Sequence, residues 1–332
     1  MAKRRDHEEP LDRVFRELAD ASPGLHDVDP PEDDLPPGLP EPLIELYART
    51  GGARLYIDAL ELVPAREAAF DRSAPLGSGP DLYGKPGGGM RWRFASIDGD
   101  AVSVDARGKV WRGDASIEDD VCEGTRLDRW LAGQVDALAV LFDRDGEYAD
   151  EVFDEHGEIM PVVRERQLRA QLKRDAAAPG PRWRLAHVLL EQGAAENARD
   201  ELEQVVADDP AFFWAWLDLA RVSERLGEIG GAIDEARMAA EAAEGVQHAQ
   251  AGYFWSQVAR LAARAGDDMV RAEAATKASL LAPGLKRDQL EGARERLDAG
   301  DRASAKGLLE LLRAVWPRDL EVLELSKRLT SA

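Results

Sequence analysis

Residues 185–198 read LAHVLLEQGAAENA, and 34 positions later residues 219–232 read LARVSERLGEIGGA. The two stretches share a Leu-Ala pair, a valine, a glycine and a closing alanine at the same places. Glycine permits a tight turn between two helices, and alanine lets the two helices approach closely. A period near 34 residues with small residues at fixed places is typical of helix–turn–helix units that stack into a solenoid.

Four glycines extend this pattern. Gly193, Gly227, Gly266 and Gly300 lie 34, 39 and 34 residues apart, and each ends an amphipathic stretch. The longer interval holds about five extra residues at 245–250, so we expect a long second helix in that unit. The spacing predicts four units over residues 179–319, followed by a capping helix over residues 320–332.

These units resemble the tetratricopeptide repeat (TPR). In the second unit the resemblance is carried by Trp216, Leu219, Ala220, Gly227 and Ala232. The other three units repeat much of this set, as Leu185, Ala186, Gly193, Ala198 and Pro210, then Trp255, Ala259, Gly266 and Pro283, then Ala293, Gly300, Ala305 and Pro317. The resemblance implies an all-α solenoid that binds partners rather than catalyses a reaction.

The charge of the chain points to protein partners. The net charge is −21, and residues 1–178 carry −15 of it. A field of this sign disfavours nucleic acid and anionic membranes and favours basic proteins. Cys122 is the single cysteine, which excludes an internal disulfide and a cysteine-based metal site. The chain shows no apolar run long enough to span a bilayer and no secretory signal, so we expect a cytoplasmic protein.

The N-terminal part has a different periodicity. An amphipathic helix at residues 11–18 and a proline-rich tether at 30–42 precede a second helix, which Gly51 and Gly52 end. Alternating apolar residues then predict strands near 54–63, 91–95, 100–105 and 109–112, and helical spacing predicts a helix over 127–142. Helices that flank a strand meander predict an α+β domain.

This order of elements is similar to that of the SUKH superfamily over residues 11–142, with a generic α+β domain as the alternative. The residues that carry the resemblance are Leu39, Pro40, Leu43, Leu46, Tyr47, Gly51, Gly52, Phe94, Ala95, Asp98, Gly99, Asp105, Gly108, Val110, Leu127, Trp130 and Leu131. The resemblance implies a SUKH-like antiparallel sheet with helices that acts as a binding module. It also implies toxin partners that contact the sheet and loops, and no catalytic residues.

The predicted organisation is therefore a SUKH-like α+β domain over residues 1–150, a hairpin and helical connector over 151–178, and the TPR-like solenoid from 179. Residues 176–181 are expected to form an exposed joint. The predicted function is non-catalytic protein–protein interaction of adaptor or toxin-immunity type. A housekeeping scaffold without a toxin partner is the alternative within binding proteins.

A nucleotide hydrolase is the alternative from another class. Residues 79–85 have the glycine and lysine spacing of a phosphate-binding loop, ending at Lys85. However, Pro86 replaces the metal-binding hydroxyl residue, and no apolar strand or following helix flanks the loop. We therefore expect a surface loop and no cofactor.

Two short motifs near residue 150 are better explained as turns than as a calcium site. Residues 143–147 read DRDGE and residues 154–158 read DEHGE, with strand-like residues between them. Leu141 and Val152 stand where a calcium loop needs its first and last carboxylates. The five histidines show no ligand spacing, so the sequence predicts no metal site and no catalytic residues.

One row of basic residues is a candidate binding site. Steps of one unit from His187 lead to Arg221, Arg260 and Arg294, and Arg225 and Arg264 follow one helical turn later. If first-helix residues face the groove, these six side chains would hold an acidic or C-terminal peptide through arginine–carboxylate pairs. The alternative is a solvated face whose arginines pair with Glu191, Glu224 and Asp298. The tryptophans Trp183, Trp214, Trp216 and Trp255 are expected to pack in the core.

Overall fold

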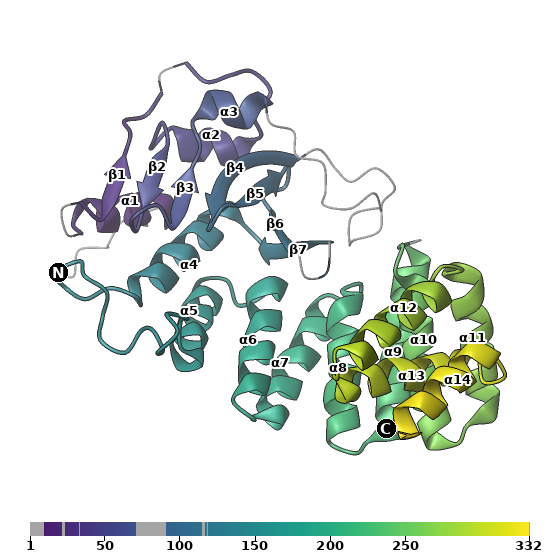
Figure 1. Cartoon of the computed structure of the whole chain (residues 1–332). Coiled ribbons are helices and arrows are strands. Elements are labelled where there is room, and N and C mark those ends of the chain that lie inside the picture. Colours follow the sequence, from purple (N-terminus) through teal and green to yellow (C-terminus); the bar gives the residue numbers. More distant parts are fainter. Residues whose placement is uncertain are drawn as a thin grey trace, which may run out of the picture. The chain divides into compact units, whose positions relative to one another are not determined.

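The computed structural model describes residues 10–331, apart from residues 22–23, 33, 71–90, 115–116, 118 and 247. The described residues divide into two compact units, one up to Glu201 and one from Leu202 onward. Figure 1 labels their elements. The division differs from the predicted boundary at residue 179, because the first helix of the predicted solenoid packs within the N-terminal unit.

The N-terminal unit is built on a seven-stranded antiparallel sheet. Its strands follow one another in chain order, so every neighbouring pair is a hairpin or a longer antiparallel connection. The strands are β1 (His26–Val28), β2 (Ala53–Leu55), β3 (Leu60–Leu62), β4 (Arg91–Ile97), β5 (Asp100–Asp105), β6 (Val110–Asp114) and β7 (Asp119–Gly124). The predicted α+β class with an antiparallel sheet is confirmed.

Six helices accompany this sheet, namely α1 (Pro10–Ala19), α2 (Glu41–Tyr47), α3 (Ala65–Phe70), α4 (Leu127–Ala139), α5 (Pro161–Arg174) and α6 (Pro179–Glu191). Helix α4 contacts β7 and packs against α1, α2 and α5 (Figure 1). Its Trp130 ring meets the Phe94 ring of β4 edge to face at 5.3 Å between centroids. Both side chains are buried, so α4 anchors the apolar core of the unit to the sheet.

Residues 141–160 form the two predicted hairpins in tandem. Asp143 Oδ1 accepts hydrogen bonds from the backbone N–H groups of Asp145 and Glu147, at 2.9 and 3.1 Å. Asp154 repeats the pattern in the second turn. Each turn ends in a left-handed glycine, which carries no Cβ penalty there. Antiparallel bridges between Phe142 and Tyr148 and between Phe153 and Ile159 close the two turns, so the interpretation as hairpins is confirmed.

Helix α6 packs directly against β7, so the predicted exposed joint is wrong for residues 178–181, whereas Ala176 and Ala177 are exposed. The segment from Ala178 to Pro181 is buried. A Cβ on Gly180 would lie 2.8 Å from the Cys122 carbonyl oxygen, which means that only glycine allows this close approach. Asp175 also accepts hydrogen bonds from the backbone and hydroxyl of Thr125, at 2.6 and 2.7 Å. Helix α6 thereby covers an edge of the sheet.

The C-terminal unit is helical. It contains α8 (Phe213–Arg225), α9 (Ile229–Gly245), α10 (Ala251–Ala265), α11 (Asp268–Leu281), α12 (Leu285–Asp298), α13 (Arg302–Val315) and α14 (Leu320–Ser331), while α7 (Ala195–Asp208) spans the division between the units. The four repeat glycines all have positive φ angles of 75–84°. The predicted turns and the predicted long helix, α9 with 17 residues, are confirmed.

The packing of the last hairpin departs from a simple stack. Helix α10 packs against α9, α11 and α13, whereas α12 packs against α13 and α14. Trp183 and Trp255 are buried as predicted, and Trp214 and Trp216 are half-buried. None of the helices in the described part of the chain combines the length and apolar composition that a bilayer crossing requires.

Candidate functional site

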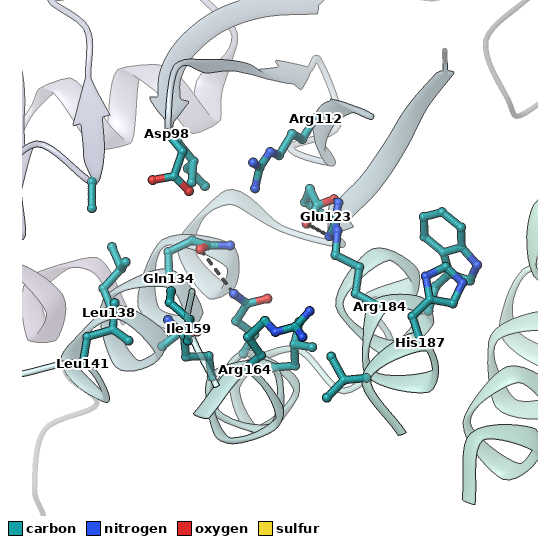
Figure 2. Close-up of a pocket in the computed structure, with 18 of the residues that line it drawn as sticks. Asp98, Arg112, Glu123, Gln134, Leu138, Leu141, Ile159, Arg164, Arg184 and His187 are labelled. Carbon is teal, nitrogen blue, oxygen red and sulfur yellow. Dashed lines mark hydrogen bonds and ion pairs between the residues drawn. The ribbon is translucent and has the colours of Figure 1, made fainter. Parts of the chain in front are cut away.

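The N-terminal unit contains a cavity of about 530 Å³ between the sheet, the tandem hairpins and helices α4, α5 and α6. Figure 2 shows how the side chains converge on it. Its apolar wall includes Leu138 of α4, Leu141 in the turn after α4, Ile159 of the second hairpin and Val188 of α6. Because α6 supplies one wall, the cavity depends on the docking of that helix.

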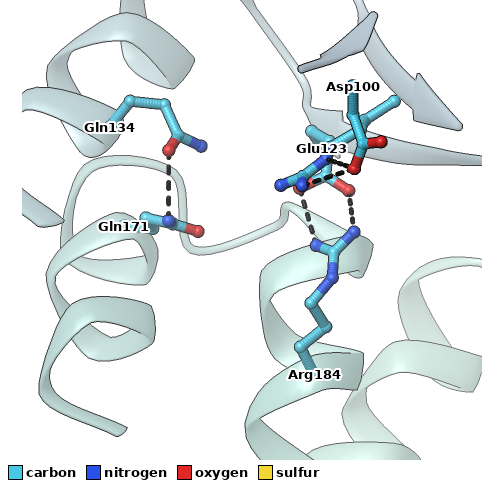
Figure 3. A network of polar contacts seen from close by, with 6 residues as sticks. Asp100, Glu123, Gln134, Gln171 and Arg184 are labelled. Atoms are coloured by element: carbon cyan, nitrogen blue, oxygen red, sulfur yellow. Dashed lines mark hydrogen bonds and ion pairs between the residues drawn. The ribbon is translucent and has the colours of Figure 1, made fainter. Parts of the chain in front are cut away.

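Three arginines line the cavity, and each is held by a carboxylate. Arg184 of α6 donates two hydrogen bonds to Glu123 of β7, at 2.5 and 2.8 Å (Figure 3). Arg112 is paired with Asp100, and Arg164 is paired with Glu191. The arginines therefore add no uncompensated positive charge.

The Glu123–Arg184 pair is the most enclosed of the three. The Glu123 side chain is 3% exposed. Burial alone would lower the pKa of Arg184, but attraction to Glu123 and the hydrogen bonds between them outweigh burial and raise it above its ordinary value. Arg184 is thus charged, and its two hydrogen bonds to Glu123 fasten α6 to the sheet.

A pair of amides faces the same cavity. Gln134 of α4 is only 6% exposed and accepts a hydrogen bond from Nε2 of Gln171 in α5, at 3.3 Å. Figure 3 shows the Gln134 Nε2 and the Gln171 Oε1 directed away from this bond. Neither atom makes a hydrogen bond with another described residue. One donor and one acceptor are therefore available side by side.

Acidic and aromatic groups surround the mouth of the cavity. Asp98 lies in the β4–β5 turn with φ 51°, and it has no ion pair with any described residue. Tyr148 and Phe153 of the tandem hairpins are 51% and 39% exposed, and their rings meet edge to face at 5.0 Å. Aromatic side chains this exposed at a cavity mouth are typical of a binding surface.

One predicted site residue lies at this cavity. Within the described residues no group of three or more His, Cys, Asp or Glu side chains could hold a metal ion. His187, a predicted site residue, lines this cavity with its ring 4.5 Å from that of Trp183. Lys85 and its loop lie outside the described residues.

The other predicted site residues lie in the C-terminal unit, where the structure groups some of them. Arg260 donates two hydrogen bonds to Glu224, at 2.6 and 2.8 Å, and Arg264 also binds Glu224. Arg221 pairs with Asp218 of its own helix, and Arg225 is exposed. The alternative predicted from sequence, pairing with Glu224, is thus present for two of the arginines.

Arg294 is not grouped with Arg260. It lies on α12 beside Glu321 of α14, at 3.4 Å, and lines a different hollow. The reason is that α13, not α12, packs against α10. Glu191 and Asp298 also pair with arginines outside the predicted row, namely Arg164 and Arg328.

A hollow of about 340 Å³ opens between α10 and α13 and takes in two of the predicted arginines. Arg260 and Arg264 line one side, and Arg313 of α13 lines the other. Ala263, Pro317 and Leu323 provide apolar surface, and Glu310 is the one acidic residue on the wall. Arg313 and Leu323 were missed from sequence because they lie on α13 and α14, outside the first helices that carry the repeated arginines. We call this site the arginine hollow.

Burial and charge act in opposite directions on Glu224. Burial would raise its pKa, but hydrogen bonds and attraction from Arg260 and Arg264 hold the pKa below its ordinary value of 4.5. Glu224 is therefore ionised at neutral pH. It fixes the two guanidinium groups at the edge of the arginine hollow.

Comparisons with known proteins found no family model that matches the chain and no matching curated protein. Among solved structures, MamA is 19% identical with a TM-score of 0.34, over 52% of this chain and 93% of that chain. PilF of Pseudomonas aeruginosa is 15% identical with a TM-score of 0.34, over 49% of this chain and 72% of its own.

YrrB, described as a TPR protein with an unusual peptide-binding site, is 17% identical. Its TM-score is 0.32, over 49% of this chain and 81% of that chain. All three TM-scores lie below 0.5, so these likenesses do not decide what the cavity or the arginine hollow binds.

Proposed function

We propose that this chain is a non-catalytic protein-binding protein of the adaptor or toxin-immunity type, and that its helical unit binds an acidic or C-terminal peptide segment. The observation that carries the proposal is the arginine hollow. Three arginines converge there from two helices that are not adjacent in sequence. In a chain of net charge −21, such a gathering of positive charge needs an explanation.

The local charge balance supports an anionic ligand. Residues 251–332 contain 14 Lys and Arg and 12 Asp and Glu, a net charge of +2, whereas residues 201–250 contain 3 and 11, a net charge of −8. Positive charge is thus concentrated in the helices that form the hollow. Acidic segments are attracted to this part of the molecule and repelled by most of the remainder.

The arginines differ in how available they are. Arg260 is 15% exposed and engaged with Glu224, so it serves to hold the site in shape. Arg264 is 49% exposed, and Arg313 is exposed and forms no ion pair with a described residue. Arg225 is exposed and forms no ion pair with a described residue, but it does not line the arginine hollow. Arg264 and Arg313 carry the forked hydrogen bonds to a ligand carboxylate, at roughly 1.5–3 kcal/mol per charged bond.

The immunity interpretation concerns the N-terminal unit. The unit resembles the SUKH superfamily in its motifs, and its sheet with flanking helices is compatible with a partner-binding module. An immunity role predicts that the gene lies beside that of a secreted toxin and that the toxin binds this unit. A housekeeping scaffold predicts no such neighbour.

The carboxylate proposal is tested with the full chain and an N-acetylated octapeptide of alanine and glutamine that ends in Glu-Asp with a free carboxylate. Its C-terminally amidated form is the matched probe. Fluorescence anisotropy is expected to show tighter binding of the free-carboxylate form. The double change Arg264→Glu with Arg313→Glu should abolish binding, while Arg287→Glu with Arg318→Glu, an equal change in charge outside the hollow, should leave binding mostly intact. Equal losses in both double variants would refute the proposed site.

A further inference from the structure

We propose that the cavity of the N-terminal unit binds an extended basic segment of a partner protein. This site is separate from the arginine hollow and prefers the opposite charge. Failure of either proposal therefore leaves the other standing. Three features of the cavity carry the inference, namely its amide pair, its apolar wall and its acidic mouth.

The Gln134–Gln171 pair supplies recognition of a peptide backbone. Gln134 Nε2 is a donor and Gln171 Oε1 an acceptor, and both residues line the cavity. Figure 3 shows the two atoms directed away from the bond that joins the side chains. If both amides rotate by 180°, donor and acceptor change places but one of each is still left free. A peptide group offers the complementary C=O and N–H. A peptide that offers both groups would pair with the free donor and the free acceptor at the same time.

The apolar wall accommodates an aliphatic side chain. Leu138 of α4, Leu141 in the turn after α4 and Val188 of α6 line the cavity, and Figure 2 labels the two leucines. A volume of about 530 Å³ exceeds that of a single side chain. The site therefore has room for a short extended stretch in which one apolar residue points inward.

The mouth of the cavity selects positive charge. Asp98 points toward the cavity in Figure 2 and has no ion pair with a described residue. The tandem hairpins beside it, residues 143–158, contain eight Asp and Glu and one Arg, a net charge of −7. All eight carboxylates are exposed. Exposed Tyr148 and Phe153 on these hairpins also provide ring faces for a guanidinium or ammonium group.

These features together favour a peptide over a small cation. A polyamine has nitrogen donors and an alkyl chain, but it has no acceptor for the Gln134 amide. It would also leave most of the hairpin carboxylates without a partner. A basic segment with an apolar residue satisfies the amide pair, the apolar wall and the acidic mouth at once. The hairpin turns are held by their own backbone hydrogen bonds, so the carboxylates are presented without an ordering cost in the turns.

The probe for this site is an N-acetylated, C-amidated nonapeptide in which lysine and leucine alternate, labelled for fluorescence anisotropy. The double change Asp145→Asn with Glu147→Gln keeps the backbone contacts of the first turn and removes two charges. If each exposed pair contributes about 0.2–1 kcal/mol, the affinity should fall about 2- to 30-fold. The control is Glu41→Gln with Glu45→Gln on α2, an equal change at exposed residues of a helix that, unlike the hairpins, supplies no residue to the cavity lining.

The amide pair is tested by Gln134→Leu and, at the half-buried partner position, by Gln171→Leu. Each variant should bind the nonapeptide more weakly, and the melting temperature of the chain should change by no more than a few degrees. Spermidine should compete poorly. The proposal is overturned if the α2 control loses as much affinity for the nonapeptide as the hairpin variant does. It is also overturned if spermidine displaces the nonapeptide at a comparable concentration while a folded glutamine variant binds normally.

Discussion

Replacing Arg184 by leucine removes the cation that fastens α6 to the sheet. The change leaves the Glu123 carboxylate, 3% exposed, without its only described ion-pair partner. Breaking a buried ion pair in this way costs about 3–5 kcal/mol. Because Arg184 itself is 26% exposed, we expect the lower end, about 3 kcal/mol. For a unit of this size that corresponds to a fall in melting temperature of about 6–12 °C.

The assay is differential scanning calorimetry of the full chain with two companion variants. Arg166→Leu, at an exposed position on the neighbouring helix α5, should move the melting temperature little. Glu123→Leu combined with Arg184→Leu should recover most of the loss, because no charge is then left buried. The reasoning is refuted if Arg184→Leu behaves like Arg166→Leu, since α6 would then not depend on this pair.

Three further predictions concern the packing and the charges. Gly180→Val should destabilise the N-terminal unit, because the valine Cβ would lie 2.8 Å from a backbone oxygen. Gly230→Ala should be neutral or slightly stabilising, because the space around Gly230 is open. Thermal unfolding followed by circular dichroism compares the two variants. Limited proteolysis should spare residues 178–181, and rapid cleavage there would contradict the docking of α6 on β7. Glu224→Gln should cost about 1–3 kcal/mol at pH 7. The pKa of Glu224 is lower in the folded state than its ordinary value of 4.5. The stabilisation that Glu224 provides is therefore fully present above pH 4.5 and is lost as the pH falls through the folded-state pKa. The stability difference between wild type and Glu224→Gln should therefore shrink toward pH 3, and a constant difference would disprove the ion-pair explanation.

Features that depend on local sequence were predictable. A glycine at the end of an amphipathic stretch accounts for the four left-handed turns, and the DxxG pattern accounts for both hairpins near residue 150. In each case the residue that determines the conformation lies inside the element it shapes. The periodicity change from strands to helices is local in the same way, so the two structural classes were predicted correctly.

Features that depend on contacts between distant residues were not predictable. Residues 176–181 have the composition of a linker, yet proline and glycine at 179–181 form the first turn of α6, which is buried on β7. Arg184 meets a carboxylate 61 positions earlier, and Gln134 meets an amide 37 positions later. No spacing rule within a helix or hairpin indicates such pairs. Arg294 fits the 34-residue period, but the packing of α13 on α10 separates it from Arg260.

The most direct test of the binding account is hydrogen–deuterium exchange of the full chain with each of the two peptides. The lysine–leucine nonapeptide should slow exchange in residues 141–160 and at the exposed ends of α5 and α6, with no effect on α10 and α13. The peptide with the free carboxylate should slow exchange around residues 260–264 and 310–317 only. Protection of the same segments by both peptides, or of none by either, would contradict two sites of opposite charge preference.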